Sequence, residues 1–284
     1  MNLFQAIVLG LVQGLTEFLP ISSSAHLTLT GKLFGLISPD TASSWTAFIA
    51  VIQLGTLLAV VLYFFKDLLQ MASSLKADWA MHGVFRGYRQ YSVHSRLALL
   101  VIVGTMPMAF IGVAMSKVIH SMFTKSTVVI ASSLIGLALL LWLAERLATH
   151  KRTLEHLTWL DALVIGTAQA LALIPGSSRS GTTITAGLFL NLTREAAARF
   201  SFLLSIPAIA ASGLYEFIKV REGLAGIGAA NLAAATLVSA IVGYASIAWL
   251  LRFLVTNTTM SFVVYRIALG VLLIALLSFG VMEF

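Results

Sequence analysis

Two short polar stretches interrupt an apolar sequence, and both contain side chains that can bind or transfer a phosphate group. The first begins with Gln13 and Glu17, which share one face of a helix because they are four residues apart. A carboxylate inside an apolar segment is costly, so it usually faces a partner or a water-filled cavity. We therefore predict that Glu17 belongs to an internal site; the alternative is a glutamate that reaches water from a helix end.

Three serines follow Glu17, and they are candidates for anion binding and for chemistry. Pro20 ends the preceding helix, so Ser22, Ser23 or Ser24 is expected to cap the next one. A helix N-terminus is a ready anion site, because its free N–H groups lie at the positive end of the helix dipole. His26 falls in the first turn, where it could reach the hydroxyl of Ser22 or Ser23. A serine beside a histidine is a candidate nucleophile–base pair; serines that only cap and pack are the alternative.

The second polar stretch, at 175–181, has the composition of an anion-binding loop. Its glycines let the backbone approach a ligand, and successive N–H groups can form an anion-binding nest. Arg179 lies between two apolar segments, where its guanidinium suits bidentate binding of phosphate oxygens. A structural Arg179, paired with Glu17 or with helix carbonyls, is compatible with this role, since a resting ion pair could open for a substrate. Other candidates for phosphate binding are Gly176, Ser177, Ser178, Ser180 and, in mid-span, Gln53, for which interhelical hydrogen bonding is an equal explanation.

Composition places both stretches in a membrane. Hydrophobic residues make up 59% of the 284 residues and charged residues only 10%, whereas about a quarter of a soluble domain is charged. Most of the outer surface must therefore face lipid. The net charge of +7 lies between apolar runs, so we attribute it to membrane orientation and not to nucleic-acid binding. The chain has no cysteine, which excludes a disulfide framework and a thiolate metal site.

Six apolar segments have the length of a membrane span, which takes about 20 residues. They are 46–65, 96–116, 127–144, 196–218, 233–254 and 262–282. Four others are shorter or interrupted: 3–19, 25–37, 160–174 and 182–192. A polar stretch joins each short pair, and the second member of each is too short to span. We therefore predict two re-entrant hairpins.

The order of segments occurs twice, in residues 1–150 and 151–284. Pro20-Ile-Ser-Ser-Ser aligns with Pro175-Gly-Ser-Ser-Arg, and Gln13 matches Gln169. Each repeat has three spans, an odd number, so the second must be inverted relative to the first. We predict an all-α integral membrane protein with two inverted-topology repeats in one membrane domain, each repeat a re-entrant helical hairpin plus three transmembrane helices.

The distribution of Lys and Arg predicts the orientation. One face receives Lys66, Lys76, Arg86, Arg89, Arg96, Arg146, Lys151, Arg152, Arg194, Arg199 and Arg252, and the other receives Lys117, Lys125, Lys219 and Arg221. The richer face is expected to be cytoplasmic, which leaves both termini outside.

The polar stretches also carry a family resemblance. Gln13-Gly-Leu-Thr-Glu-Phe-Leu-Pro-Ile-Ser-Ser-Ser-Ala-His26, together with 175–181, resembles the undecaprenyl-diphosphate phosphatases associated with bacitracin resistance. The match in segment order and length covers the whole chain. It implies a bacterial cytoplasmic membrane enzyme that hydrolyses undecaprenyl diphosphate to the monophosphate, recycling the lipid carrier of cell-wall synthesis. It also implies a divalent metal, magnesium or calcium, and a site carried by Glu17, Ser23, His26 and Arg179.

We assign Ser23 as the nucleophile of a phosphoserine mechanism, with His26 activating it or protonating the leaving phosphate; His26 as nucleophile stays open. The family has Glu or Gln at position 13, where Gln13 could ligate metal beside Glu17 but cannot act as a base. The expected partners are an isoprenoid lipid diphosphate and the bilayer, and a homodimer is compatible with the sequence. A transporter or flippase of a phosphorylated lipid or anion is the alternative, since such a carrier needs only Arg179 and backbone amides.

Overall fold

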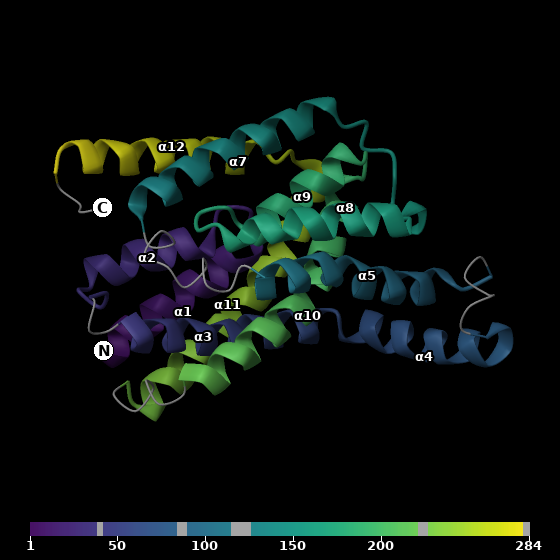
Figure 1. The fold of residues 1–284 in the computed structure, drawn as a ribbon, viewed down its shortest axis with the longest axis horizontal. Coiled ribbons are helices and arrows are strands. Elements are labelled where there is room, and N and C mark those ends of the chain that lie inside the picture. Colours follow the sequence, from purple (N-terminus) through teal and green to yellow (C-terminus); the bar gives the residue numbers. More distant parts are fainter. Residues whose placement is uncertain (39–41, 84–89, 115–125, 221–226, 281–284) are drawn as a thin grey trace.

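A computed structural model describes residues 1–38, 42–83, 90–114, 126–220 and 227–280, and Figure 1 shows its fold. In these residues the regular secondary structure is helical, and the single β-bridge joins Arg152 and Leu192. The prediction of an all-α membrane protein is confirmed. The orientation residues Arg86, Arg89, Lys117, Lys125 and Arg221, the side chain of Lys219 and the predicted span ends at 115–116 and 281–282 lie outside the described residues.

Six helices among the described residues are long and apolar enough to cross a membrane. They are α3 (Ala42–Tyr63), α5 (Val93–Ala114), α7 (Thr127–Leu147), α10 (Arg194–Val220), α11 (Ala229–Thr256) and α12 (Met260–Ser278). Each overlaps one predicted segment, with ends that differ by a few residues. The chain is therefore a multi-pass membrane protein.

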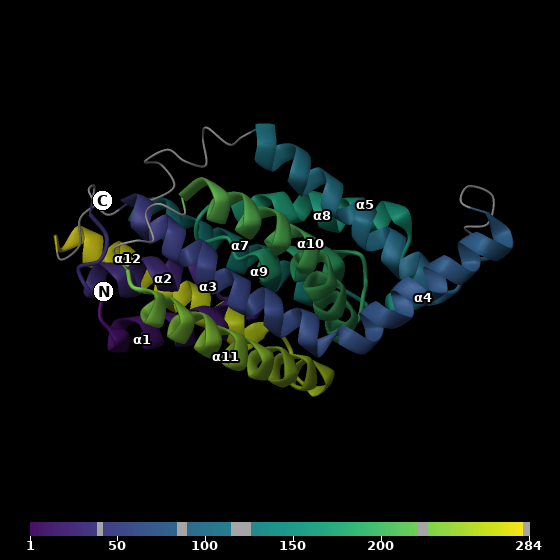
Figure 2. The same cartoon turned by 90° about the horizontal axis from the view of Figure 1, so that it is seen from below.

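One helix was not expected. α4 (Phe65–His82) lies between the predicted spans 46–65 and 96–116, where the sequence predicted no helix, and it projects away from the other helices in Figures 1 and 2. No glycine or proline interrupts it. The negative charge of Asp67 in its first turn interacts favourably with the positive end of the helix dipole. Apolar run length did not reveal this helix, because a helix outside the membrane needs only one apolar face.

The predicted hairpins are formed by four shorter α-helices and one 3-10 helix. The first hairpin is α1 (Leu3–Phe18) and α2 (Ser23–Leu33), and the second is α8 (Trp159–Ala170), the short 3-10 helix η3 (Leu171–Leu173) and α9 (Arg179–Phe189). The helices that follow each turn, α2 and α9, begin with the same unusual cap. Ser22 and Ser178 have φ of 77° and 68°, and each accepts a hydrogen bond from the N–H three residues later.

These caps correct the alignment of the two repeats by one residue. Ser22 corresponds to Ser178, not to Ser177 as the prolines suggested, and the alignment of Gln13 with Gln169 then holds without a gap. Ser23 consequently corresponds to Arg179. The position of the cap is the better guide, because it fixes where each helix begins, whereas a proline can precede that point by a variable distance.

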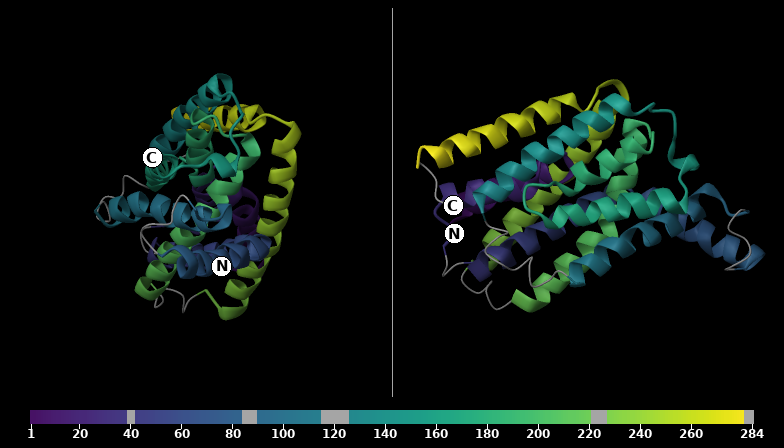
Figure 3. Two further views of the ribbon diagram at one scale, coloured as in Figure 1. Left: turned by 90° about the vertical axis from the view of Figure 1, so that its right-hand side faces the viewer. Right: turned by 45° about the horizontal axis from the view of Figure 1, so that its top comes forward.

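The contacts between helices are related by the twofold operation that exchanges the two repeats. α1 packs on α11 as α8 packs on α5, while α3 packs on α10 and α7 on α12; Figure 3 shows α7 and α12 side by side. Glycines permit the closest approaches: a Cβ at Gly10 would lie 2.3 Å from the Ala235 carbonyl oxygen, and one at Gly166 would lie 1.9 Å from that of Gly104. Small residues of this kind let membrane helices pack closely. These pairings are those expected of a twofold repeat, whose inversion stays a prediction.

Single cysteines in this cysteine-free chain test the inverted hairpins. We expect Leu3→Cys and Leu33→Cys to be labelled from one side of the membrane, and Trp159→Cys and Phe189→Cys from the other. All four side chains are exposed, and a re-entrant hairpin returns to the face from which it entered. The measurement is labelling of intact and opened cells with an impermeant maleimide. Labelling of Leu3→Cys and Leu33→Cys from opposite sides would show that the first hairpin crosses the membrane.

Candidate active site

The turns of the two hairpins meet at Glu17, in the last turn of α1. Its Oε2 accepts hydrogen bonds from Ser23 Oγ at 2.8 Å and from Gln13 Nε2 at 3.0 Å. Its Oε1 pairs with the guanidinium of Arg179, the first residue of α9. Glu17 is buried, so the loss of either partner of this ion pair would leave an uncompensated charge in the interior. Three predicted site residues, Glu17, Ser23 and Arg179, are thus in direct contact across the two repeats.

Backbone amides add a second anion-binding element. The first N–H groups of α2, from Ser23 and Ser24, and those of α9, from Arg179 and Ser180, have no acceptor within the described part of the chain. The next amide of each helix bonds instead to the capping hydroxyl, Ala25 to Ser22 at 3.3 Å among them. Free amides at two helix N-termini, beside a guanidinium, form a cradle for a phosphate group.

The remaining serines hold the two turns together. The N–H of Gly176 donates to Ser24 Oγ at 3.2 Å, and Ser180 Oγ donates to the Leu19 carbonyl oxygen at 3.0 Å. The caps Ser22 and Ser178 lie 3.1 and 3.2 Å from the hydroxyls of Ser24 and Ser180. Ser177 is buried. The hydroxyls of Ser22, Ser24, Ser178 and Ser180 therefore cap and cross-link the loops, whereas the buried Ser177 hydroxyl has no partner among the described residues.

His26 does not contact the hydroxyl of either predicted serine. Its Nδ1 lies 2.7 Å from the Ser22 carbonyl oxygen, and its Nε2 lies 2.6 Å from the hydroxyl of Tyr265 on α12. Because a carbonyl only accepts, Nδ1 carries the proton, and neutral Nε2 accepts from Tyr265. The two rings are stacked, with centroids 5.6 Å apart. In the first turn the carbonyl four residues earlier competes with the serine hydroxyls for His26, and it is the nearer partner.

Several residues of the site were missed by sequence reasoning. Gln13 donates to Thr56 Oγ1 at 3.4 Å, and Thr56 Oγ1 donates to the backbone carbonyl oxygen of Gln53 at 2.8 Å. Phosphate binding by the Gln53 side chain stays a prediction. Tyr265 carried no signal, since tyrosines are common in apolar spans. Arg266 did carry one: it is an arginine inside the apolar segment 262–282, where charge is rarely without a role.

The arrangement does not fit a protein-held magnesium or calcium ion. These cations prefer several oxygen ligands, and no cluster of three or more acidic or histidine side chains occurs in the described residues. Both carboxylate oxygens of Glu17 already have partners, and one of these partners is the Arg179 guanidinium. Gln13 turns its amide nitrogen, a hydrogen-bond donor, towards Glu17. The metal predicted at Glu17 and Gln13 stays a prediction, and we assign it no step.

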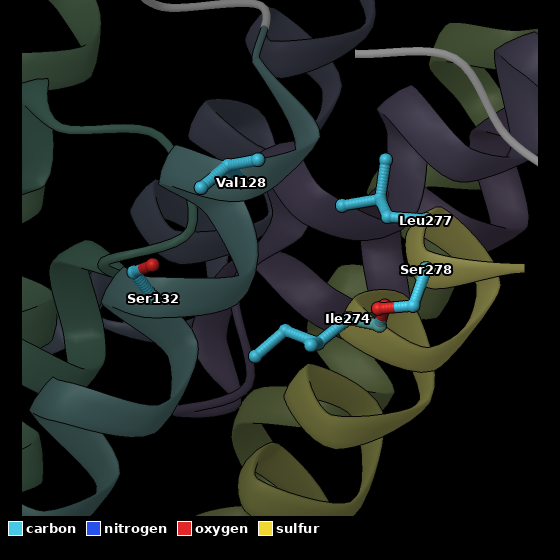
Figure 4. Close-up of a pocket in the computed structure, with 5 residues that line it drawn as sticks. All are labelled: Val128, Ser132, Ile274, Leu277 and Ser278. Atoms are coloured by element: carbon cyan, nitrogen blue, oxygen red, sulfur yellow. The ribbon is translucent and has the colours of Figure 1, made fainter. Parts of the chain in front are cut away.

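A groove lies elsewhere, between α7 and α12. Its volume is about 310 Å³. Figure 4 shows its lining residues, Val128, Ser132, Ile274, Leu277 and Ser278. None of them is a predicted site residue, and the lining is mostly apolar, as expected of a surface between lipid-facing helices. The meeting point of the two hairpins is therefore the candidate active site.

Fold and site together define a class: a multi-pass helical membrane protein with an anion-binding centre where two helical hairpins meet. Residues 6–272 match the family described as bacitracin resistance protein BacA, and the chain belongs to this family. Proteins named undecaprenyl-diphosphatase are close in sequence. That of Syntrophobacter fumaroxidans is 53% identical, with 95% of each chain covered. That of Myxococcus xanthus is 51% identical over 99% of this chain and 91% of its own, and that of Chloroherpeton thalassium 48% identical over 100% and 99%. The family resemblance noted in the sequence is confirmed.

The ion pair at the centre predicts strong coupling between Glu17 and Arg179. Glu17→Gln should lower the melting temperature, because it leaves a buried guanidinium without its counter-charge, at a cost of about 3 kcal/mol. Arg179→Gln should also lower the melting temperature, because it leaves the buried Glu17 carboxylate without its counter-charge. The double variant, which removes both charges, should regain at least about 1 kcal/mol of the summed losses. Melting temperatures of all four proteins in one detergent provide the measurement, and additive losses would mean that the pair contributes no coupling.

Proposed function

We propose that this chain hydrolyses undecaprenyl diphosphate to undecaprenyl phosphate and phosphate in the cytoplasmic membrane of a bacterium, recycling the lipid carrier of cell-wall synthesis. One observation carries the proposal: a serine hydroxyl, Ser23, is hydrogen-bonded to a buried carboxylate, Glu17, between two helix N-termini. Nucleophile, base and anion cradle are then in one place. The names of the relatives agree with this activity.

Substrate binding begins with an exchange of partners at Arg179. The terminal phosphate of the substrate takes the guanidinium, whose planar fork matches two phosphate oxygens. The free N–H groups at the starts of α2 and α9 donate hydrogen bonds to the remaining phosphate oxygens. Ser24 is exposed and Ser23 is partly exposed, so a headgroup can reach the cradle while its isoprenoid tail stays in lipid. Once Arg179 has turned to the phosphate, Glu17 loses its cation and becomes a stronger base.

The chemical step follows from the contact between Ser23 and Glu17. Ser23 Oγ attacks the terminal phosphorus and its proton passes to Glu17 Oε2, 2.8 Å away in the resting site. The bond between that phosphorus and the bridging oxygen breaks, and undecaprenyl phosphate leaves. Glu17 then releases the proton taken from Ser23 to solvent. Water attacks the phosphoserine and passes a proton to Glu17, which returns it to Ser23 Oγ as the bond between that oxygen and phosphorus breaks and phosphate departs. Positioning and charge stabilisation dominate such a transfer, and the helix N-termini and Arg179 provide both.

This mechanism reassigns two predicted roles. Glu17, not His26, activates Ser23, because among the described residues it is Glu17 that hydrogen-bonds to the Ser23 hydroxyl. We assign His26 the other predicted role, protonation of the departing lipid phosphate. Tyr265 orients the His26 imidazole for this step. All of these residues belong to one chain, so a homodimer, which stays a prediction, is not needed for the site.

The carrier alternative is less well supported because the two hairpins differ. Leu173 stands where the second repeat would need a counterpart of Glu17, and Thr182 where it would need one of His26. A carrier that alternates between two faces gains nothing from a base on one hairpin alone. We also propose that the repeats are inverted, that each contributes one hairpin to a single membrane domain, and that both chain ends lie outside.

Phosphate release in detergent tests the function, since no gradient exists there to drive transport. We expect wild-type protein to release phosphate from undecaprenyl diphosphate labelled in its terminal phosphate, and a quench with acid to trap label on the protein. Ser23→Ala should abolish both signals. Ser22→Ala should fold and retain most of the turnover, because it loses a cap worth about 1 kcal/mol. A parallel assay with chelator reads out the predicted metal.

Two outcomes would contradict this scheme. Wild-type protein without turnover in detergent would favour the carrier. Label trapped equally in Ser23→Ala would move the nucleophile to His26.

Tyr265→Phe tests the orienting role. The change removes one hydroxyl and keeps the stacked ring, so we expect an unchanged melting temperature and turnover about three- to tenfold lower, the size of one lost hydrogen bond. With His26 already replaced by Gln, the same change should have no further effect. Tyr244→Phe, at an exposed tyrosine of α11, is the control. Equal losses in both His26 backgrounds would show that Tyr265 acts independently of His26.

A further inference from the structure

Arg266 on α12 is fully buried and lies beneath the candidate active site. Its guanidinium donates to the carbonyl oxygens of Pro20 at 3.3 Å, of Gly176 at 3.3 Å and of Ser177 at 3.0 Å. Two further acceptors, the carbonyls of Ser133 and Leu134 on α7, lie 3.4 and 3.2 Å away. One side chain thus holds the turns of both hairpins and a third helix.

The charge of Arg266 is the unusual feature. Among the described residues, Arg152, Arg179, Arg194 and Arg199 each form an ion pair with a carboxylate. No carboxylate of the described part lies within ion-pair distance of Arg266. Carbonyl dipoles satisfy its N–H groups but leave its charge uncancelled. Glu17 and Arg179 cancel each other, so the side chains grouped at this site carry one net positive charge, that of Arg266.

The carbonyl bonds also determine where the second loop points its amides. In a planar trans peptide the C=O and the following N–H point in opposite directions. Because the Ser177 carbonyl points at Arg266, the N–H of Ser178 points away from it, and α9 then begins with the free amides of Arg179 and Ser180. Arg266 thereby stabilises the loop in the conformation that directs its donors towards a ligand.

We propose that Arg266 is a positioning residue of the phosphatase site, which fixes both loops from beneath and whose uncancelled charge is balanced when the diphosphate binds. In an apolar interior this charge acts over several ångströms with little screening. Its counter-ion in the working enzyme is the substrate, which it need not touch. The proposal rests on the proposed function for the identity of the anion.

Binding of inorganic pyrophosphate to the purified protein in detergent tests the proposal without any turnover. Arg266→Gln should weaken binding by at least about tenfold, because it removes the charge that no carboxylate of the described residues pairs with at this site. Arg252→Gln, at an exposed arginine of α11, removes the same charge from the surface and should leave the affinity unchanged. Arg266→Lys keeps the charge but loses most of the carbonyl contacts, so its affinity should stay within about threefold while kcat falls at least about tenfold.

A glycine substitution moves the guanidinium without changing its charge. A Cβ at Gly181 would lie 2.6 Å from Nη1 of Arg266, so Gly181→Ala must displace that end of the side chain. We expect it to lower kcat, whereas Gly136→Ala on α7, where a Cβ meets nothing within 4 Å, should not. If Arg266→Gln does not fold, the comparison of Gly181→Ala with Gly136→Ala still tests the proposal.

Wild-type pyrophosphate affinity in folded Arg266→Gln would overturn the proposal, as would an equal loss in Arg252→Gln. If Arg266→Gln does not fold, unchanged kcat in both Arg266→Lys and Gly181→Ala would overturn it. The failure of the proposed function looks different: wild-type protein would bind pyrophosphate through Arg266 but release no phosphate from the lipid.

Discussion

The structure depends on one constraint: two hairpins turn round inside an apolar bundle, where lipid offers no hydrogen bonds to exposed backbone. Each turn must satisfy its polar groups from within the protein. The carbonyls bond to Arg266, the serine caps close the helix starts, and Ser24 with Gly176 joins one turn to the other. Among the groups of the described turns that stay without an acceptor are the first N–H groups of α2 and α9. The arrangement that stabilises the turns therefore also creates the anion site.

The same apolar surroundings make the ion pair of Glu17 and Arg179 both stable and reactive. Neither group can be buried alone without a large cost, so in the absence of ligand they bind each other. A phosphate offers Arg179 an equivalent partner, and Glu17 is then left beside the Ser23 hydroxyl with no cation to hold it. The resting contact and the activated site differ only in which anion the guanidinium holds.

Two similar hairpins divide the work between them. They share the serine caps and the glutamines at corresponding positions, but Ser23 corresponds to Arg179 and Glu17 to Leu173. In the proposed mechanism the first hairpin contributes nucleophile and base, and the second contributes the guanidinium. A site built from unlike halves acts on a ligand from one side, as an enzyme does.

The sequence by itself determined the membrane class, the six spans, the hairpins and the pairing of Glu17, Ser23 and Arg179 as candidates, because composition and apolar run length are local properties. It did not determine α4, which apolar run length did not reveal. Only the tertiary structure decided that Thr56 meets Gln13, that Tyr265 holds His26 from 239 positions away, and that Arg266 joins both turns. Spacing within one helix predicts which side chains share a face, but the partner across that face is set by how the helices pack, and packing brings together residues that are far apart in the sequence.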